Sequence, residues 1–211
     1  MLVSSLLVAC LLHFVHANSG SNTVSSVDVF VAGQTYPCYR QPVLVAANAT
    51  LLAFSEARNN TNCSGTVDGY PKWIVLRRSM DGGKSWGAIQ TLYEGSIDFL
   101  TALYDPRMGR SHLMIQQGST TVEYTTSDDD GATWSSIKAI PMSGSQYSVT
   151  KPAVGHGIVL GHGGAPCATG KPGRLLMPFV CAGKSNAQTS STADIACPGC
   201  FSCVAMSDDG G

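Results

Sequence analysis

The sequence predicts an all-β protein, and two observations lead to that prediction. Short runs of β-branched, aromatic and aliphatic residues alternate with clusters of Gly, Ser, Asn and Asp, the pattern of strands joined by tight turns. No apolar repeat with the 3.6-residue period of a helix continues for more than two turns. The 23 glycines among 211 residues fit a chain with many tight turns.

Six segments are predicted as strands. One begins at Tyr39-Arg40-Gln41-Pro42, and the others lie at 51–54, 73–76, 111–115, 121–125 and 174–179. Glycine and proline occur between these segments, where the chain must turn.

An eight-residue turn motif occurs twice and is the most specific signal in the chain. Residues 79–86 (SMDGGKSW) and 127–134 (SDDDGATW) both fit S-x-D-x-G-x-[ST]-W, the pattern of an Asp box. The Asp can accept N–H bonds within the turn, the Gly permits a positive φ, and the Trp packs the turn on the sheet. We expect these boxes to be architectural and their aspartates not to be catalytic. The motif positions are Ser79, Asp81, Gly83, Trp86, Ser127, Asp129, Gly131 and Trp134.

The spacing of the boxes predicts a repeat architecture. Ser79 and Ser127 are 48 residues apart, about the length of a propeller blade. The chain ends on Ser207-Asp208-Asp209-Gly210-Gly211, in which Ser207, Asp209 and Gly211 fit the first positions of a third box. Because propeller blades are arranged radially, we expect a ligand to bind where the inner strands converge.

Composition excludes two classes of protein. With 44% hydrophobic residues and a formal net charge of −1, from 13 Lys and Arg against 14 Asp and Glu, the chain is not intrinsically disordered. It has no basic stripe, which argues against nucleic acid as the main partner.

The N-terminus predicts a secretory signal. Residues 1–17 are a short apolar run without acidic or basic residues, and Val15 and Ala17 place small residues before a cleavage site. An uncleaved anchor is the alternative, and no later stretch is long and apolar enough to span a bilayer. Residues 18–211 then form the folded part. Three triplets fit the N-glycosylation pattern, which makes Asn48, the Asn59-Asn60-Thr61 triplet and Asn62 candidates.

Seven cysteines follow the signal and are expected to be mostly disulfide-bonded in an oxidising compartment. An odd number leaves one of them free or paired elsewhere. Cys197-Pro-Gly-Cys200-Phe-Ser-Cys203 has zinc-ligand spacing, but no second such pair lies nearby, so disulfides are favoured over zinc. We predict no cofactor and no metal.

The candidate chemistry lies before and around the first box. YRQP at 39–42 is followed by LLAFSEAR at 51–58, by Asp68, and by IVLRRSMDGGKSW at 74–86. This order and spacing resemble the sialidase (neuraminidase) superfamily, and most closely the lysosomal sialidase of animals. In that family F/Y-R-I-P precedes L-L-A-F-x-E-x-R, an Asp, the strand x-L-R-R-S and an Asp box. The resemblance runs from about Val27 to the last residue and is most specific up to Trp134.

The resemblance implies a six-bladed β-propeller, of which about the first three blades are present here. It also implies that Arg40 is one of three arginines that bind the sialic acid carboxylate, a role that suits a planar, permanently charged guanidinium. Arg58 is implied to bind the sugar near its ring hydroxyls, and Asp68 to be the general acid and base. Sialidases use a Tyr as nucleophile. That Tyr, its Glu partner and two further arginines are not placed among these residues.

Other residues receive structural interpretations. If its strand continues, Glu56 is expected to point away from Arg58, and it is assigned a structural role. Arg77 and Arg78 are interpreted as charges at the end of a strand, and His156 and His162 as loop residues. The sequence departs from the family at Gln41, where Ile is usual, and at Ser148, where a Glu is usual; an insert from Gly183 to Cys203 is also unusual.

The predicted function is hydrolysis of terminal sialic acid from glycoproteins, oligosaccharides and gangliosides by a retaining exo-sialidase. Its partners are therefore sialylated glycans, in the lysosome or outside the cell. A trans-sialidase and a non-catalytic Asp-box propeller that binds sialoglycans are the alternatives. We expect the 211 residues alone to be inactive, because a partial propeller exposes sheet faces.

Overall fold

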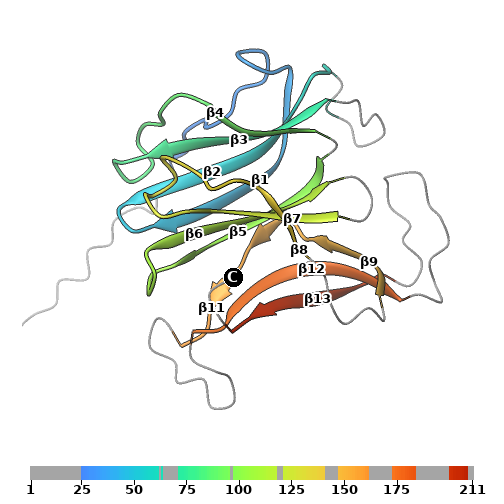
Figure 1. The fold of residues 1–211 in the computed structure, drawn as a ribbon. Coiled ribbons are helices and arrows are strands. Elements are labelled where there is room, and N and C mark those ends of the chain that lie inside the picture. Colours follow the sequence, from blue (N-terminus) through green and yellow to red (C-terminus); the bar gives the residue numbers. More distant parts are fainter. Residues whose placement is uncertain are drawn as a thin grey trace, which may run out of the picture.

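The described structure consists of strands and turns. The computed structural model describes residues 25–61, 63, 71–95, 97–117, 121–140, 147–161, 173–183 and 200–208. Three sheets lie one above another in Figure 1, and the described residues contain no helix. These residues therefore also contain no helix that is long and apolar enough to cross a membrane. The prediction of an all-β chain is confirmed.

The first sheet is an antiparallel meander at the top of Figure 1. It contains β1 (Cys38–Ala47), β2 (Thr50–Arg58), β3 (Lys72–Ser79) and β4 (Gln90–Gly95), hydrogen-bonded in that order. The predicted strand segments at 39–42, 51–54 and 73–76 all lie within its first three strands.

The second and third sheets repeat this arrangement with additions. The second contains β5 (Ile97–Asp105), β6 (Arg110–Gln117), β7 (Thr121–Ser127) and β8 (Lys138–Ile140), and the short β10 (Gly155–His156) pairs parallel to β5. The third contains β11 (Ile158–Val159), β12 (Leu175–Gly183) and β13 (Cys200–Ser207), and β9 (Tyr147–Pro152) pairs with β12.

Two hydrophobic clusters hold the sheets together. The first combines Phe54 and Leu76 of the first sheet with Leu100 and Leu113 of the second. The second cluster combines Leu103 and Val122 of the second sheet with apolar residues of β12. Because side chains alternate along a strand, the second sheet contributes one face to each cluster.

The two eight-residue turns at 79–86 and 127–134, called here the first and second motif turns, have the same hydrogen bonds. In the second, Asp129 Oδ1 accepts from the Ser127 hydroxyl and from the Thr133 N–H, both at 2.8 Å, and Oδ2 accepts from the Thr133 hydroxyl at 2.6 Å. Asp81 has the corresponding bonds in the first turn. Hydrogen bonds from the Thr133 and Ser85 side chains are the main reason that the pKa values of Asp129 and Asp81 fall to about 2.

The second motif turn also packs on the first sheet. Gly131 has a φ of 78°, and a Cβ there would lie 2.8 Å from Leu52 of β2. The Trp134 ring meets Phe54 edge to face at 5.7 Å, and the Arg78 Nε donates to the Asp130 carbonyl oxygen at 2.9 Å. The first and second sheets are thus joined by a turn as well as by apolar packing.

The strand pairs β2–β3, β6–β7 and β12–β13 have the same register in the three sheets. The Ser that opens each turn pairs with the corresponding residue of the preceding strand: Ser79 with Leu51, Ser127 with Ser111, and Ser207 with Leu175. Arg110 and Asp128 form a two-bond ion pair beside the second turn, and Arg174 and Asp208 form the same pair in the third sheet. Ser207 thus has the predicted position, whereas Asp209 and Gly211 lie outside the described residues.

Two disulfides are present, which confirms the expected use of cysteine for these four residues. Cys38 of β1 is bonded to Cys63, and Cys181 of β12 to Cys203 of β13. Cys203 belongs to the C-x2-C-x2-C run that has zinc-ligand spacing. Because its sulfur forms the disulfide with Cys181, it is not a thiolate that could bind zinc. Cys197 lies outside the described residues.

We predict that the motif turn contributes measurable stability through its aspartate. Asp129→Ala removes the acceptor of three hydrogen bonds at an exposed position, so it is expected to lower the free energy of unfolding by about 1–3 kcal/mol. The measurement is urea denaturation of the full-length protein. Asp128→Asn is the matched control on the same turn, because a surface ion pair contributes only about 0–1 kcal/mol. Equal losses in the two variants would contradict the prediction.

A buried histidine lies between the second and third sheets. His112 of β6 is fully buried, and its Nδ1 is 2.7 Å from the Tyr124 hydroxyl. Burial is the main cause that lowers its pKa from 6.5 to about 4. The charged groups that act on it are Asp105, Arg110, Asp128 and Arg107.

The depressed pKa of His112 predicts a loss of stability in acid. The unfolded chain takes up a proton near pH 6.5 and the folded chain only near pH 4, so stability falls as the pH drops through this window. The loss amounts to about 3 kcal/mol for a shift of this size. His112→Gln is expected to remove this part of the pH dependence in denaturation curves. His156→Gln, at an exposed histidine, is the control; an unchanged pH profile in His112→Gln would contradict the assignment.

Candidate functional site

The candidate site lies at one end of the first sheet, where β1 and β3 begin and β2 ends. Arg40 is directly opposite Glu56, and Arg58 lies between Cys38 and Lys72. Directly opposed residues of antiparallel strands point to the same face, as do residues two apart on one strand. Arg40, Glu56, Arg58 and Lys72 therefore share one face, and it is the face that carries the first hydrophobic cluster.

Glu56 and Arg58 form a buried ion pair in which the Arg58 Nε donates to Glu56 Oε1. The expectation that Glu56 points away from Arg58 is therefore wrong. The physical reason is the two-residue period of a strand, which places residues 56 and 58 on the same side. Glu56 therefore positions the guanidinium of Arg58 in addition to its place in strand β2.

Burial distinguishes this cluster from an ordinary surface pair. Glu56 and Lys72 are 0% exposed and Arg58 is 2% exposed, although these residue types are almost never fully buried unless paired. Sequence reasoning missed Lys72, which follows Pro71 and lacks a motif. Its signal was available in the strand pattern, because Lys72 occupies an inward position two residues before Ile74.

A β-bulge lies next to Arg40. The register between β1 and β2 shifts between Arg40 and Val43, and Gln41 has a φ of 54°. Bulges bend a strand and redirect the neighbouring side chain, and they are common beside active sites. A β-branched residue would be strained at this φ, and Gln is not branched at Cβ. The Arg40 side chain is half-buried, and its backbone carbonyl accepts a bond from the Ser55 hydroxyl at 2.8 Å.

Asp68, the predicted acid and base, lies outside the described residues, as does Asn62. The Cys38–Cys63 disulfide nevertheless connects the segment that follows β2 to β1, and Cys38 is two residues from Arg40 on the same strand. The covalent link therefore attaches that segment to the end of the sheet that carries both arginines.

The motif turns lie at the opposite end of the sheets. In the pairing of β2 with β3, Lys72 is opposite Arg58, whereas Ser79 is opposite Leu51. Seven residues of strand separate the two ends, which is about 23 Å at roughly 3.3 Å per residue. The aspartates of the turns are thus too far away to act on a ligand held by Arg40 and Arg58.

The remaining candidates have structural contacts. Arg77 Nη1 donates to the Val29 carbonyl oxygen at 2.8 Å, and Arg78 binds the second motif turn. His156 is exposed in β10, opposite Ala102, and His162 lies outside the described residues. Ser148 lies in β9, at the position where the sequence resemblance expected a Glu.

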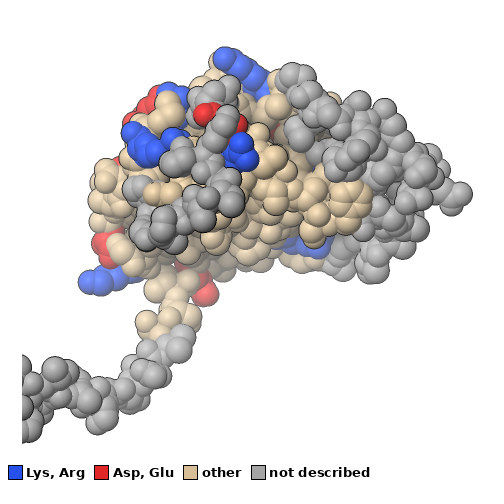
Figure 2. All heavy atoms as spheres, turned by 90° about the horizontal axis from the view of Figure 1, so that it is seen from below, with Lys and Arg blue, Asp and Glu red and all other residues tan. Residues whose placement is uncertain are grey.

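The surface and the donor groups restrict the kinds of ligand. On the face shown in Figure 2, Lys and Arg lie in separate groups among the described residues and form no continuous stripe. The described part of the chain contains no group of three His, Cys, Asp or Glu residues that would hold a metal ion. Guanidinium groups at one sheet end are suited to a carboxylate ligand, which they can bind with two parallel N–H bonds.

The chain resembles solved sialidase structures in fold. No protein-family profile and no curated protein matches it. The Hadza microbial sialidase Hz136 is 19% identical over 83% of this chain and 36% of its own, with a TM-score of 0.61. The leech intramolecular trans-sialidase, complexed with 2,7-anhydro-Neu5Ac, is 13% identical over 90% of this chain and 45% of its own, with a TM-score of 0.66. The Trypanosoma rangeli sialidase in complex with sialic acid is 16% identical over 82% of this chain and 29% of its own, with a TM-score of 0.54.

These likenesses define the fold. The chain shares the strand arrangement of part of a sialidase, and it spans between 29% and 45% of the length of these three structures. At identities of 13–19% the match concerns the fold alone, so the roles of individual residues depend on the sequence motifs and on the site geometry.

We predict that the Glu56–Arg58 pair is required for a stable fold. Glu56→Gln keeps the shape of the side chain but removes the charge that the buried Arg58 Nε contacts. Breaking a buried pair costs about 3–5 kcal/mol, so a loss of unfolding free energy in this range is expected. Glu94→Gln on β4, at an exposed carboxylate, is the matched control and should change stability little. Equal stabilities of the two variants would contradict the prediction.

Proposed function

We propose that this chain forms the first three blades of a six-bladed Asp-box propeller that works as a retaining exo-sialidase. Three stacked sheets with a common register, two of which carry a turn of the same type, support the blade assignment. The order of the YRQP, LLAFSEAR and Asp-box motifs supports a relationship to the sialidase superfamily, and to the lysosomal sialidase of animals in particular.

The observation on which this proposal rests is the arrangement of Arg40 and Arg58. Both lie on one face at the end of the first sheet, away from the motif turns, with Glu56 bonded to Arg58. Sialic acid carries a carboxylate on its anomeric carbon, and a guanidinium can bind that group in two-bond geometry. We assign Arg40 to the carboxylate and Arg58 to the ring hydroxyls.

The proposed chemistry has two steps. A Tyr oxygen attacks the anomeric carbon as its phenolic proton passes to the neighbouring Glu, the bond to the leaving oxygen breaks, and Asp68 gives its proton to that oxygen. Water then attacks the same carbon and Asp68 takes the proton of the water, while the Tyr–sugar bond breaks and the Glu returns its proton to the phenolate. A neutral phenol suits this substrate, because a carboxylate nucleophile would be repelled by the sugar's own carboxylate. The Tyr, its Glu and the other two arginines are assigned to later blades.

We further propose that the protein acts on sialylated glycoproteins, oligosaccharides and gangliosides. The apolar segment at 1–17 supports transport into the secretory pathway, with the lysosome or the extracellular space as destination. The Cys38–Cys63 and Cys181–Cys203 disulfides support an oxidising compartment.

The test is turnover of a fluorogenic sialoside by full-length protein at acidic and neutral pH. Arg40→Lys is expected to lower kcat/KM by at least about tenfold, because Lys cannot make the two-bond contact. Asp68→Asn is expected to lower kcat by roughly 100-fold or more, since the general acid is lost. Arg110→Lys, at the opposite sheet end, is the control and should keep full activity. Intact substrate with the unmodified protein would refute the proposal.

A trans-sialidase is the second candidate, favoured by the fold likeness to the leech intramolecular trans-sialidase. It would share the site residues assigned here and differ in its acceptor. Product analysis with and without lactose separates the two, because a transferase forms sialyllactose or an anhydro sugar where a hydrolase releases free sialic acid. A non-catalytic binding protein would hold the sialoside without turnover, and equilibrium binding measurements would identify it.

A further inference from the structure

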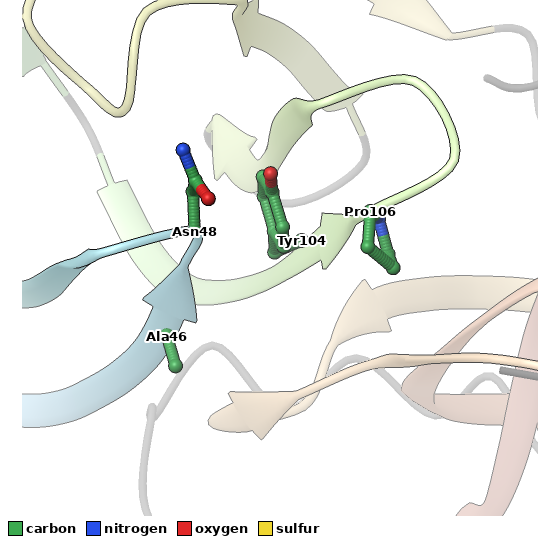
Figure 3. Close-up of a pocket in the computed structure, with 4 residues that line it drawn as sticks. All are labelled: Ala46, Asn48, Tyr104 and Pro106. Carbon is green, nitrogen blue, oxygen red and sulfur yellow. The ribbon is translucent and has the colours of Figure 1, made fainter. Parts of the chain in front are cut away.

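A hollow at the motif-turn end of the first two sheets is lined in part by the first residue of one glycosylation triplet. It has a volume of about 470 Å³ and is lined by Ala46 of β1, Asn48 of the β1–β2 turn, Tyr104 of β5 and Pro106, which follows β5 (Figure 3). The hollow lies at the opposite end of the first sheet from Arg40 and Arg58, so what it binds is independent of the proposed catalytic site.

Asn48 is well placed as an acceptor. It is the first residue of the two-residue turn between Ala47 and Thr50, with a φ of 53°, a conformation that Asn tolerates better than most residues. Its side chain is exposed, and Asn48-Ala49-Thr50 fits the acceptor pattern. Thr50 is 3% exposed in the folded chain, so modification must precede closure of the hairpin.

Tyr104 supplies a surface suited to a sugar ring. The ring packs partly against the first hydrophobic cluster, which holds it in place, and Figure 3 shows it beside Asn48 with both side chains projecting to the same side. Burial raises the pKa of its hydroxyl, so the ring is neutral at physiological pH. Aromatic residues of this kind combine a large apolar face with a polar edge, which matches the C–H faces and hydroxyl edges of a pyranose.

We propose that Asn48 carries an N-linked glycan whose first N-acetylglucosamine lies in this hollow against Tyr104 and Pro106. The volume is within the range of roughly 300–1,000 Å³ typical of small-molecule sites, which leaves room for one sugar residue. In the transfer, the Asn48 amide nitrogen bonds to the anomeric carbon of a polyprenyl-diphosphate-linked oligosaccharide. The carbon–oxygen bond to diphosphate breaks, and the amide nitrogen loses one proton.

The glycan would stabilise the hairpin by covering this hollow. A sugar fixed at Asn48 needs no separate association step, so even weak stacking on Tyr104 is effective because it is intramolecular. Asn59, the first residue of another triplet, follows Arg58 at the opposite end of the sheet, whereas Asn48 has the aromatic residue of the hollow next to it.

The experiment uses full-length protein made in animal cells, with the other triplets removed by Thr61→Ala and Ser64→Ala. Mass spectrometry of the peptide that contains Asn48 measures occupancy before and after treatment with a peptide N-glycosidase, which converts the glycosylated Asn to Asp. The melting temperature is then compared between the glycosylated and the deglycosylated protein. Asn48→Asp reproduces the deglycosylated state without enzyme treatment.

Glycan at Asn48 and a higher melting temperature of the glycosylated form are expected. Tyr104→Leu should keep the glycan but remove the difference in melting temperature. Tyr93→Leu is the matched control, because Tyr93 also packs partly against the first hydrophobic cluster but does not line the hollow. Unmodified Asn48 would overturn the proposal, and so would a glycan effect that is the same in Tyr104→Leu. Sialidase activity should be the same in all these forms, because the hollow lies away from the proposed catalytic site. A loss of activity would therefore bear on the proposed function and not on the glycan at Asn48.

Discussion

The packing of one sheet on the next is the constraint on which the rest of this structure depends. A sheet of this size cannot bury an apolar face alone, and here the second sheet is covered on one face by the first sheet and on the other face by the third. The second motif turn fixes the spacing, because Gly131 leaves room for Leu52 and Trp134 meets Phe54. The packing contacts of this turn lie at one end of the sheets. The other end is therefore free of them and can hold polar side chains.

Three buried charged side chains lie at one end of the first sheet, whereas the buried Asp105 lies at the motif-turn end of the second sheet. Glu56, Arg58 and Lys72 are buried on the same face as Phe54 and Ile74, where an apolar side chain would be expected to pack better. Replacing a buried ion pair by apolar residues is often neutral or stabilising, so stability alone does not account for this arrangement. The proposed binding of an anionic sugar accounts for it, because a guanidinium fixed before binding loses little freedom when the ligand arrives.

Sequence reasoning identified the features that depend on local pattern. The strands around Leu52, Ile74 and Leu113 and the hydrogen-bonding role of Asp81 and Asp129 followed from alternation and turn chemistry, and the structure confirms them. The features that depend on pairing between distant strands were missed. The bulge after Arg40 follows from strand register, which a single sequence does not display, whereas the inward position of Lys72 and the contact of Glu56 with Arg58 follow from the two-residue period of a strand.

The same register argument links the two ends of the molecule. A shift by one residue between β2 and β3 would turn Arg58 and Lys72 to the opposite face and would also move Ser79 away from Leu51. The motif turn, the disulfide at Cys38 and the bulge beside Arg40 each oppose such a shift at a different point along the strands. The first motif turn therefore contributes to the site although it lies about 23 Å from it, because it opposes a shift between β2 and β3 that would place Arg58 and Lys72 on opposite faces.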